Sequence, residues 1–196
     1  MSDDPKLPEA HAPVMRPETF ISVDVETAGA NPARFAMISI GACLVDDPTT
    51  NFYVELQPDR TEVDEKALAI SGLSMSTLAQ EGIEPTDAMT RLETWVNTVV
   101  PEGNVPIFVG FNAVFDWMFV DDYFQRYLGR NPFGHTALDI KSYSMGMSNT
   151  TWGETSLKVL SPKYLTGRPL AHNALADAQD QAELFRALRK ENADRS

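Results

Sequence analysis

The chain has 196 residues, of which 43% are hydrophobic and 22% charged, as expected for one globular domain with a full hydrophobic core. Its formal net charge is −12, with 16 Lys and Arg against 28 Asp and Glu, which argues against tight, processive binding of long nucleic acids. No apolar run approaches the roughly 20 residues of a membrane span, and a lone cysteine, Cys43, excludes an internal disulfide, so we expect a cytoplasmic protein.

The N-terminal residues 1–17 contain four prolines and lack the basic start and apolar stretch of a signal peptide. We expect them to form a disordered lead. A single domain over residues 18–190 and a short tail over 191–196 are expected to follow.

The first third of the chain predicts three strands, over residues 20–25, 37–45 and 52–56. Residues 46–50 form the turn between the last two. Short connections favour an antiparallel arrangement of this trio. Cys43 is expected to be a small buried residue within the second strand.

A helical pattern starts at Asp64, covers residues 64–70 and is ended by Ser71-Gly72. A second short helix is expected after Ser74, and a longer one starts at Pro85. Further along we expect a strand at 106–109, a helix at 113–128, a short strand at 137–140, an irregular stretch at 161–169 and a final helix at 174–190. The final helix has a core-facing stripe made of Leu175, Ala178, Ala182, Phe185 and Leu188. An antiparallel trio followed by strands separated by helices predicts an α/β domain with a mixed central sheet flanked by helices, and it resembles the ribonuclease H-like fold.

Asp24 and Glu26 lie in the apolar run Phe20-Ile21-Ser22-Val23-Asp24-Val25-Glu26-Thr27. Residues two apart in a strand point to the same face, so these two carboxylates project together, about 7 Å apart along the strand. Adjacent carboxylates repel each other unless a cation lies between them. An exposed edge strand would also explain the pair, but the surrounding residues are typical of a central strand.

Asp116 lies in the first turn of a predicted helix, in Phe108-Val109-Gly110-Phe111-Asn112-Ala113-Val114-Phe115-Asp116. By itself, an acid at this position is also explained by a favourable interaction with the helix dipole.

The third motif, His172-Asn173-Ala174-Leu175-Ala176-Asp177-Ala178, starts the last helix. On one regular helix His172 and Asp177 would diverge by about 140°. They can converge only if His172 lies in the preceding loop, and Asn173 supports this because it is a good helix N-cap. An exposed loop histidine without a function is the alternative.

Together, these three motifs resemble the active site of the DEDDh family of 3′→5′ exonucleases, which includes ribonuclease T, oligoribonuclease and the proofreading subunit of DNA polymerase III. The resemblance extends from about Phe20 to Lys190. It implies that Asp24, Glu26, Asp116 and Asp177 are metal ligands and that His172 is the general base. The family pattern commonly has a histidine where this chain has Phe111, while Asn112 is retained.

The resemblance implies phosphodiester hydrolysis with two Mg²⁺ or Mn²⁺ ions, which prefer hard oxygen ligands. Histidine has an unperturbed pKa of about 6.5 and can accept a proton near neutral pH. The expected product is a nucleoside 5′-monophosphate. Thr27 and Asn112 are expected to contact the terminal nucleotide. Phe111 and Trp152 are candidates for base stacking, although a role in the core is the more economical interpretation for both.

The expected partner is the 3′ end of single-stranded DNA or RNA, with short strands favoured by the acidic net charge; no membrane is expected, and a homodimer is left open. Four basic residues between Lys141 and Arg168 face one acid, Glu154, and form a local positive segment. One alternative is another metal-dependent phosphodiesterase or nuclease on the same fold that attacks structured RNA or small dinucleotides. The other alternative is a non-catalytic module on the same fold that binds a nucleic-acid end or a partner. Loss of one acid would have favoured that alternative, but all four are present.

Overall fold

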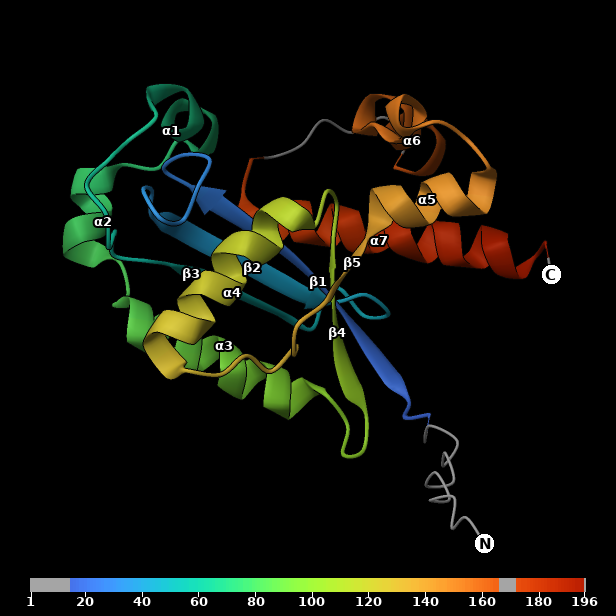
Figure 1. The fold of residues 1–196 in the computed structure, drawn as a ribbon, viewed down its shortest axis with the longest axis horizontal. Helices are drawn as coiled ribbons and strands as arrows, with labels where there is room; N and C mark the ends of the chain where they lie inside the picture. Colours follow the sequence, from blue (N-terminus) through green and yellow to red (C-terminus); the bar gives the residue numbers. More distant parts are fainter. Residues whose placement is uncertain (1–14, 166–171, 196) are drawn as a thin grey trace, which may run out of the picture.

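The computed structural model describes residues 15–165 and 172–195, and five strands form one mixed sheet in the order β3-β2-β1-β4-β5 (Figure 1). The strands are β1 (Glu18–Thr27), β2 (Met37–Leu44), β3 (Asn51–Glu55), β4 (Val105–Gly110) and β5 (Ala137–Asp139). In chain order, the helices of the described residues are α1 (Glu65–Ser71), α2 (Met75–Glu81), α3 (Pro85–Val99), α4 (Val114–Leu128), α5 (Ile140–Ser148), the 3₁₀ helix η1 (Trp152–Thr155), α6 (Leu157–Tyr164) and α7 (Ala174–Ala193).

The strand pairing confirms the expected mixed sheet. β2 pairs antiparallel with both β1 and β3, whereas β4 pairs parallel with β1 and β5. The carboxyl ends of β1, β4 and β5 therefore meet at one edge of the sheet, which is where α/β folds place their functional sites.

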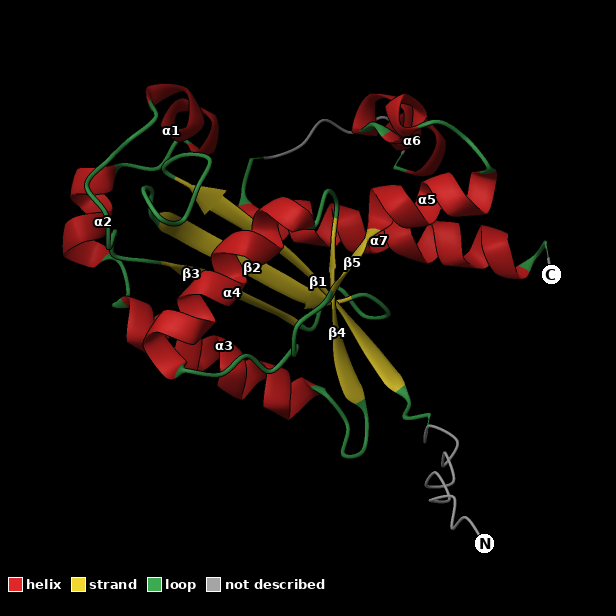
Figure 2. Cartoon of the chain, in the orientation of Figure 1, coloured by secondary structure: helices red, strands yellow, loops and turns green. Residues whose placement is uncertain are grey.

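The two faces of the sheet are covered by different helices (Figure 2). Val23 and Val25 of β1 pack in the larger hydrophobic core with residues of α3 and α4. A second core joins Cys43 of β2 and Val109 of β4 to α5, α6 and α7. Because side chains alternate along a strand, Asp24 and Glu26 lie on the α7 face of β1.

Capping residues start and stop several helices where the sequence predicts. The carboxylate of Asp64 accepts a hydrogen bond from Lys66 N at 2.9 Å, and α1 ends at Gly72, whose φ of 68° is left-handed. Asn173 caps α7 by accepting from Ala176 N at 3.2 Å. Cys43 is fully buried in β2, as expected.

The region between β5 and α7 was predicted incorrectly. Residues 161–169 were expected to be irregular, but Ser161–Tyr164 form the last turn of α6, despite Pro162 inside that helix. Residues 166–169 of this stretch lie outside the described part of the chain. The helices α5 and η1 had not been predicted, because residues 141–155 are mainly polar or small and carry little helical periodicity.

Two boundaries also differ. β1 is longer at both ends than the expected 20–25, because parallel pairing with β4 begins at Glu18. α7 continues to Ala193, beyond the expected end at Lys190. Most of the expected N-terminal lead lies outside the described residues, and β1 begins at Glu18. Within the described ranges, no helix has both the length and the apolar character that a membrane span requires.

Candidate metal centre

Asp24 and Glu26 come from β1, the middle strand of the sheet. Their neighbours Val23 and Val25 are buried in the core on the opposite face, which fixes the direction of both carboxylates. The pairing register of β1 with β2 shifts directly after Glu26, between Glu26 and Thr27. Both acids are therefore half-buried at the carboxyl end of a rigid central strand, rather than on an exposed edge.

Asp177 reaches these acids from the first turn of α7. Gly41 of β2 is the register partner of Asp24, and a Cβ atom at Gly41 would collide with the backbone of Ala174 and Leu175 at the start of α7. Because glycine has no side chain, α7 can pack directly on the sheet at Gly41. This close approach brings the buried Asp177 over β1.

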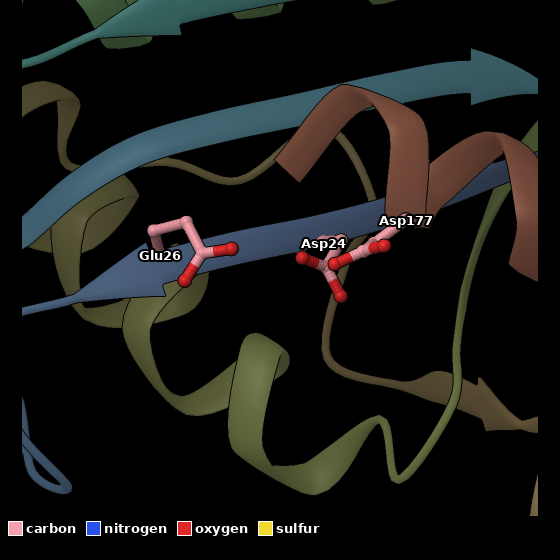
Figure 3. A group of neighbouring side chains, drawn as sticks. All are labelled: Asp24, Glu26 and Asp177. Carbon is pink, nitrogen blue, oxygen red and sulfur yellow. The ribbon is translucent and has the colours of Figure 1, made fainter. Parts of the chain in front are cut away.

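Asp24, Glu26 and Asp177 form a compact carboxylate cluster (Figure 3). Each offers an oxygen atom, and these atoms all lie within 4.8 Å of one another. Burial raises the pKa of Asp24 well above its usual value, and the negative charges of Asp116, Asp177 and Glu26 raise it further. Burial, followed by the charge of Asp177, raises the pKa of Glu26 to about 7.

Asp116 approaches from the other side of the sheet, in the first turn of α4. Its Oδ1 atom accepts a hydrogen bond from Val25 N at 3.1 Å, so the carboxylate is anchored to the backbone between the two acids of β1. Burial raises the pKa of Asp116 to about 7, although backbone hydrogen bonds to it act in the opposite direction. Its oxygen atoms are not part of the three-residue cluster, but Asp116 faces the same hollow.

A hollow of about 220 Å³ joins the acids of all three motifs. Its lining residues are Asp24, Val25, Glu26, Phe111, Asn112, Phe115, Asp116, His172 and Asp177. His172 is exposed, and it precedes the α7 cap as the sequence predicts. Asn112 and His172 have positive φ angles of 61° and 51°. Such left-handed non-glycine residues often occur at functional sites.

The donor set of this hollow suits a hard divalent cation. Carboxylate oxygens are the ligands that Mg²⁺ and Mn²⁺ prefer, and a cation would relieve the mutual repulsion that raises the pKa values of these acids. The residues present therefore fit the expected metal.

A second, more apolar hollow of about 230 Å³ adjoins the first and shares Val25, Glu26 and Phe115 with it. Thr27, Ala67 and the 55% exposed Ile70 complete its lining. The Thr27 hydroxyl donates to the Gly29 carbonyl at 2.8 Å, which holds the end of β1 in its turn. Of the two residues expected to contact the terminal nucleotide, Asn112 thus lines the acidic hollow and Thr27 the apolar one.

Two residues that organise the site were not singled out from the sequence. Gln181 lies one helical turn after Asp177, and its amide donates to Asp24 Oδ1 at 2.6 Å and accepts from Phe111 N at 3.0 Å. Asp139 accepts from Ala113 N at 2.8 Å while it caps α5. The spacing of four residues from Asp177 to Gln181 on one helix face was the available signal for Gln181.

The aromatic residues near the site also differ from expectation. Trp152 is 50% exposed and is not a core residue, whereas Phe111 is half-buried and lines the acidic hollow. The positive segment is weaker than its composition indicates, because Lys163 forms an ion pair with Glu191 of α7 at 3.0 Å. Arg168 lies outside the described residues.

Comparisons with known proteins agree on one family. The model of an exonuclease family, RNase T, matches residues 21–185. The 3′-5′ DNA exonuclease Cap18 of Escherichia coli is 45% identical over 177 residues, which cover 88% of this chain and 92% of that protein. The PolC-type DNA polymerase III of Staphylococcus haemolyticus is 25% identical over 186 residues, which cover 93% of this chain but 12% of that much longer protein.

Solved structures show the same fold. The nuclease domain of 3′hExo, a DEDDh family member bound to rAMP, superposes with a TM-score of 0.70 at 15% identity and covers 91% of this chain and 95% of that one. Escherichia coli exonuclease I in complex with a dT13 oligonucleotide gives a TM-score of 0.68 at 19% identity, over 91% of this chain and 43% of that one. The expected ribonuclease H-like fold is confirmed. The match over residues 21–185 and the 45% identical relative show that the chain belongs to the DEDDh family of 3′→5′ exonucleases.

Proposed function

We propose that the chain removes nucleoside 5′-monophosphates one at a time from the 3′ ends of short single-stranded DNA. The observation that supports this most directly is the convergence of four acids and a histidine, from three distant parts of the sequence, on one hollow. DNA is favoured over RNA because the 45% identical relative is described as a DNA exonuclease. Short strands are favoured by the net charge of −12, which repels long polyanions.

In this proposal Asp24, Glu26 and Asp177 would hold one divalent ion, and Asp116 would help to hold a second. Two such ions supply charge that lowers the pKa of water and stabilises the leaving oxyanion. The protein holds these acids in fixed positions. β1 orients Asp24 and Glu26, and the backbone of Val25 holds Asp116 by a hydrogen bond. Gly41 allows the helix that carries Asp177 to pack closely on the sheet.

His172 is proposed as the general base. It lies at the exposed rim of the hollow, where it can take a proton from an attacking water and release it to solvent. His172 lies before α7 and is not one of the three residues of the carboxylate cluster. This arrangement allows His172 to act without being a metal ligand.

The adjoining apolar hollow is proposed to receive the terminal base. Ile70 and Phe115 offer apolar surfaces on which a base of any sequence can rest. Thr27 and Asn112 are proposed to contact the sugar and phosphate of the same nucleotide, from the apolar and the acidic hollow respectively. A cytoplasmic location and a homodimer stay predictions.

A labelled-strand assay tests the proposal. DNA and RNA strands of 5 and 50 nucleotides, each labelled at the 5′ end, are incubated with Mg²⁺ or Mn²⁺ and resolved at single-nucleotide steps. We expect a ladder that shortens from the 3′ end, is abolished by EDTA, and is fastest with the short DNA. Hydrolysis that survives exhaustive chelation, or cleavage of a closed circle, would contradict the proposal. The non-catalytic alternative is not favoured, because all four acids face the hollow.

A further inference from the structure

An aromatic–lysine row, composed of Phe111, Lys141 and Trp152, leads away from the acidic hollow. Phe111 lines that hollow. The Lys141 Nζ atom lies 5.9 Å from the centre of the Phe111 ring and 4.0 Å from the centre of the Trp152 ring. The row therefore connects the start of α5 and η1 to the site, across segments that the catalytic proposal does not use.

The outer member of the row is both exposed and rigidly held. Trp152 is 50% exposed in the 3₁₀ helix η1. Glu154 Oε2 fixes this turn by accepting hydrogen bonds from Thr151 N at 2.9 Å, from Thr151 Oγ1 at 2.7 Å and from Thr150 Oγ1 at 2.6 Å. The exposed indole offers a flat surface for a base. Because hydrogen bonds already fix the turn that carries it, little conformational entropy is lost when a base stacks there.

The charge of Lys141 is available to a ligand. Across residues 15–165 and 172–195, no carboxylate forms an ion pair with Lys141, and the nearby Glu154 is satisfied by its own turn. Lys163 of the same region, by contrast, is paired with Glu191. A lysine held between two aromatic rings combines a phosphate contact with stacking surfaces, the pair of features that single-stranded nucleic acid requires.

Phe111 has a fixed place in this row. Its backbone N–H donates to Gln181 Oε1 at 3.0 Å, and the same amide group of Gln181 contacts Asp24 through its nitrogen. The inner end of the row is thus tied to the carboxylate cluster. A strand whose 3′ end enters the acidic hollow would pass over Phe111 before it reaches Lys141 and Trp152.

Building on the exonuclease activity proposed above, we propose that the aromatic–lysine row holds the nucleotides upstream of the scissile bond. Trp152 stacks on a base, and Lys141 pairs with a backbone phosphate. The row would give this acidic protein a local binding site for single strands longer than two nucleotides. The row would thereby help a chain with a net charge of −12 to hold a short DNA strand at the site.

The test compares strand lengths in matched variants. The variants are Trp152→Ala, Trp152→Phe, Lys141→Met and, as a charge-matched control, Lys190→Met at the exposed far part of α7. Two measurements are made on each: kcat/KM for a dinucleotide and for a five-nucleotide dT strand, and anisotropy binding of the five-nucleotide strand with Ca²⁺. Thermal unfolding confirms that each variant folds.

We expect Trp152→Ala to weaken five-nucleotide binding by about 10-fold, while dinucleotide kcat/KM stays within about twofold, and Trp152→Phe to retain most of the binding. Lys141→Met should weaken the same binding and reduce its salt dependence, and Lys190→Met should not. Equal losses for both lengths, unchanged binding in Trp152→Ala, or equal effects of the two lysine variants would overturn the proposal. If the wild type removes no nucleotides, the proposed function fails, and the binding measurement still decides the role of the row.

Discussion

The Gln181 amide nitrogen donates a hydrogen bond of 2.6 Å to Asp24 Oδ1, and this contact joins residues 157 positions apart in the sequence. Because Oε1 of the same amide accepts from Phe111 N, one side chain ties together β1, α7 and the loop after β4. Gln181 is buried, so its two hydrogen bonds are sheltered from water. We infer that it positions Asp24 without touching the substrate.

Substituting Gln181 by Leu tests this role. The change leaves Phe111 N without its partner and removes the hydrogen bond that lowers the pKa of Asp24. Metal affinity should fall about 10-fold, with activity largely restored at high Mn²⁺, as expected for loss of one hydrogen bond to a charged group. The matched control is Gln179→Leu, which removes an amide that donates to Pro48 O at 2.9 Å instead. An unchanged dependence of activity on Mn²⁺ concentration would show that Gln181 is only structural.

The second prediction separates the two residues of the third motif. Asp177→Asn should lose both Mn²⁺ affinity and turnover, because a neutral amide is a poorer ligand for a hard cation than a carboxylate. His172→Ala should keep metal and substrate binding but lose roughly 10²–10⁴ in rate. Calorimetric Mn²⁺ titration and single-turnover rates measure these effects, with His135→Ala as the control for an exposed histidine. If His172→Ala binds Mn²⁺ as poorly as Asp177→Asn, the assignment of His172 as a general base is wrong.

A third prediction concerns metal removal and pH. The folded protein raises the pKa of Asp24, and those of Glu26 and Asp116 to about 7, so without metal it binds more protons than the unfolded chain between about pH 4 and pH 7. The stability from these groups is present at low pH and lost as pH rises through about 7. We therefore expect the metal-free protein to have a lower Tm at pH 8 than at pH 5.5.

Divalent metal should reverse this trend, since the ligands must release their protons to bind it. Mn²⁺ should raise the Tm more at pH 8 than at pH 5.5, and EDTA should remove the difference. Asp116→Asn, which cannot titrate, should show a smaller pH effect without metal. A metal-free Tm that increases between pH 5.5 and pH 8 would contradict the prediction.

The fourth prediction concerns Gly41 and the seating of α7. In Gly41→Ala the new Cβ would collide with the backbone of Ala174 and Leu175 and lift the helix that carries Asp177. We expect a loss of about 1–3 kcal/mol in the free energy of unfolding, together with weaker Mn²⁺ binding. Gly146→Ala on α5 is the control, because its Cβ meets open space and alanine favours a helix. Denaturant unfolding would refute the idea if both variants were equally stable.

A fifth prediction lies outside the site, at Asp59. Burial raises the pKa of this carboxylate, but hydrogen bonds from Tyr123, Arg126 and Tyr127 outweigh burial and hold it below its usual value. The stability from Asp59 is therefore present above about pH 4 and is lost as pH falls through the lowered folded pKa.

At pH 7, Asp59→Asn should reduce the free energy of unfolding by about 1–3 kcal/mol, because it weakens hydrogen bonds to a charged group. This difference should shrink below pH 4. Urea titrations at pH 7 and pH 3 measure it, with the exposed Glu102→Gln as the control. An equal loss in the two variants would assign the effect to net charge and not to the Asp59 contacts.

The sequence by itself determined the features that depend on neighbouring residues. Asp24 and Glu26 share a face because a strand alternates, and His172 lies outside α7 because Asn173 is a helix cap. Gly72 ends α1 by local backbone conformation in the same way. The three motifs were therefore recognisable one at a time, together with the chemistry of their side chains.

Only the tertiary structure decided how these pieces meet. The bond from Val25 N to Asp116 spans 91 positions, and the approach of α7 to Gly41 depends on the packing of a helix on a sheet. The incorrect prediction between β5 and α7 has the same cause, since α5 and α6 are short and pack into a core shared with α7, and helices this short depend on such packing more than on their own periodicity. Long-range contacts leave no regular spacing in a sequence, and for this reason Gln181 and the aromatic–lysine row became visible only in the folded chain.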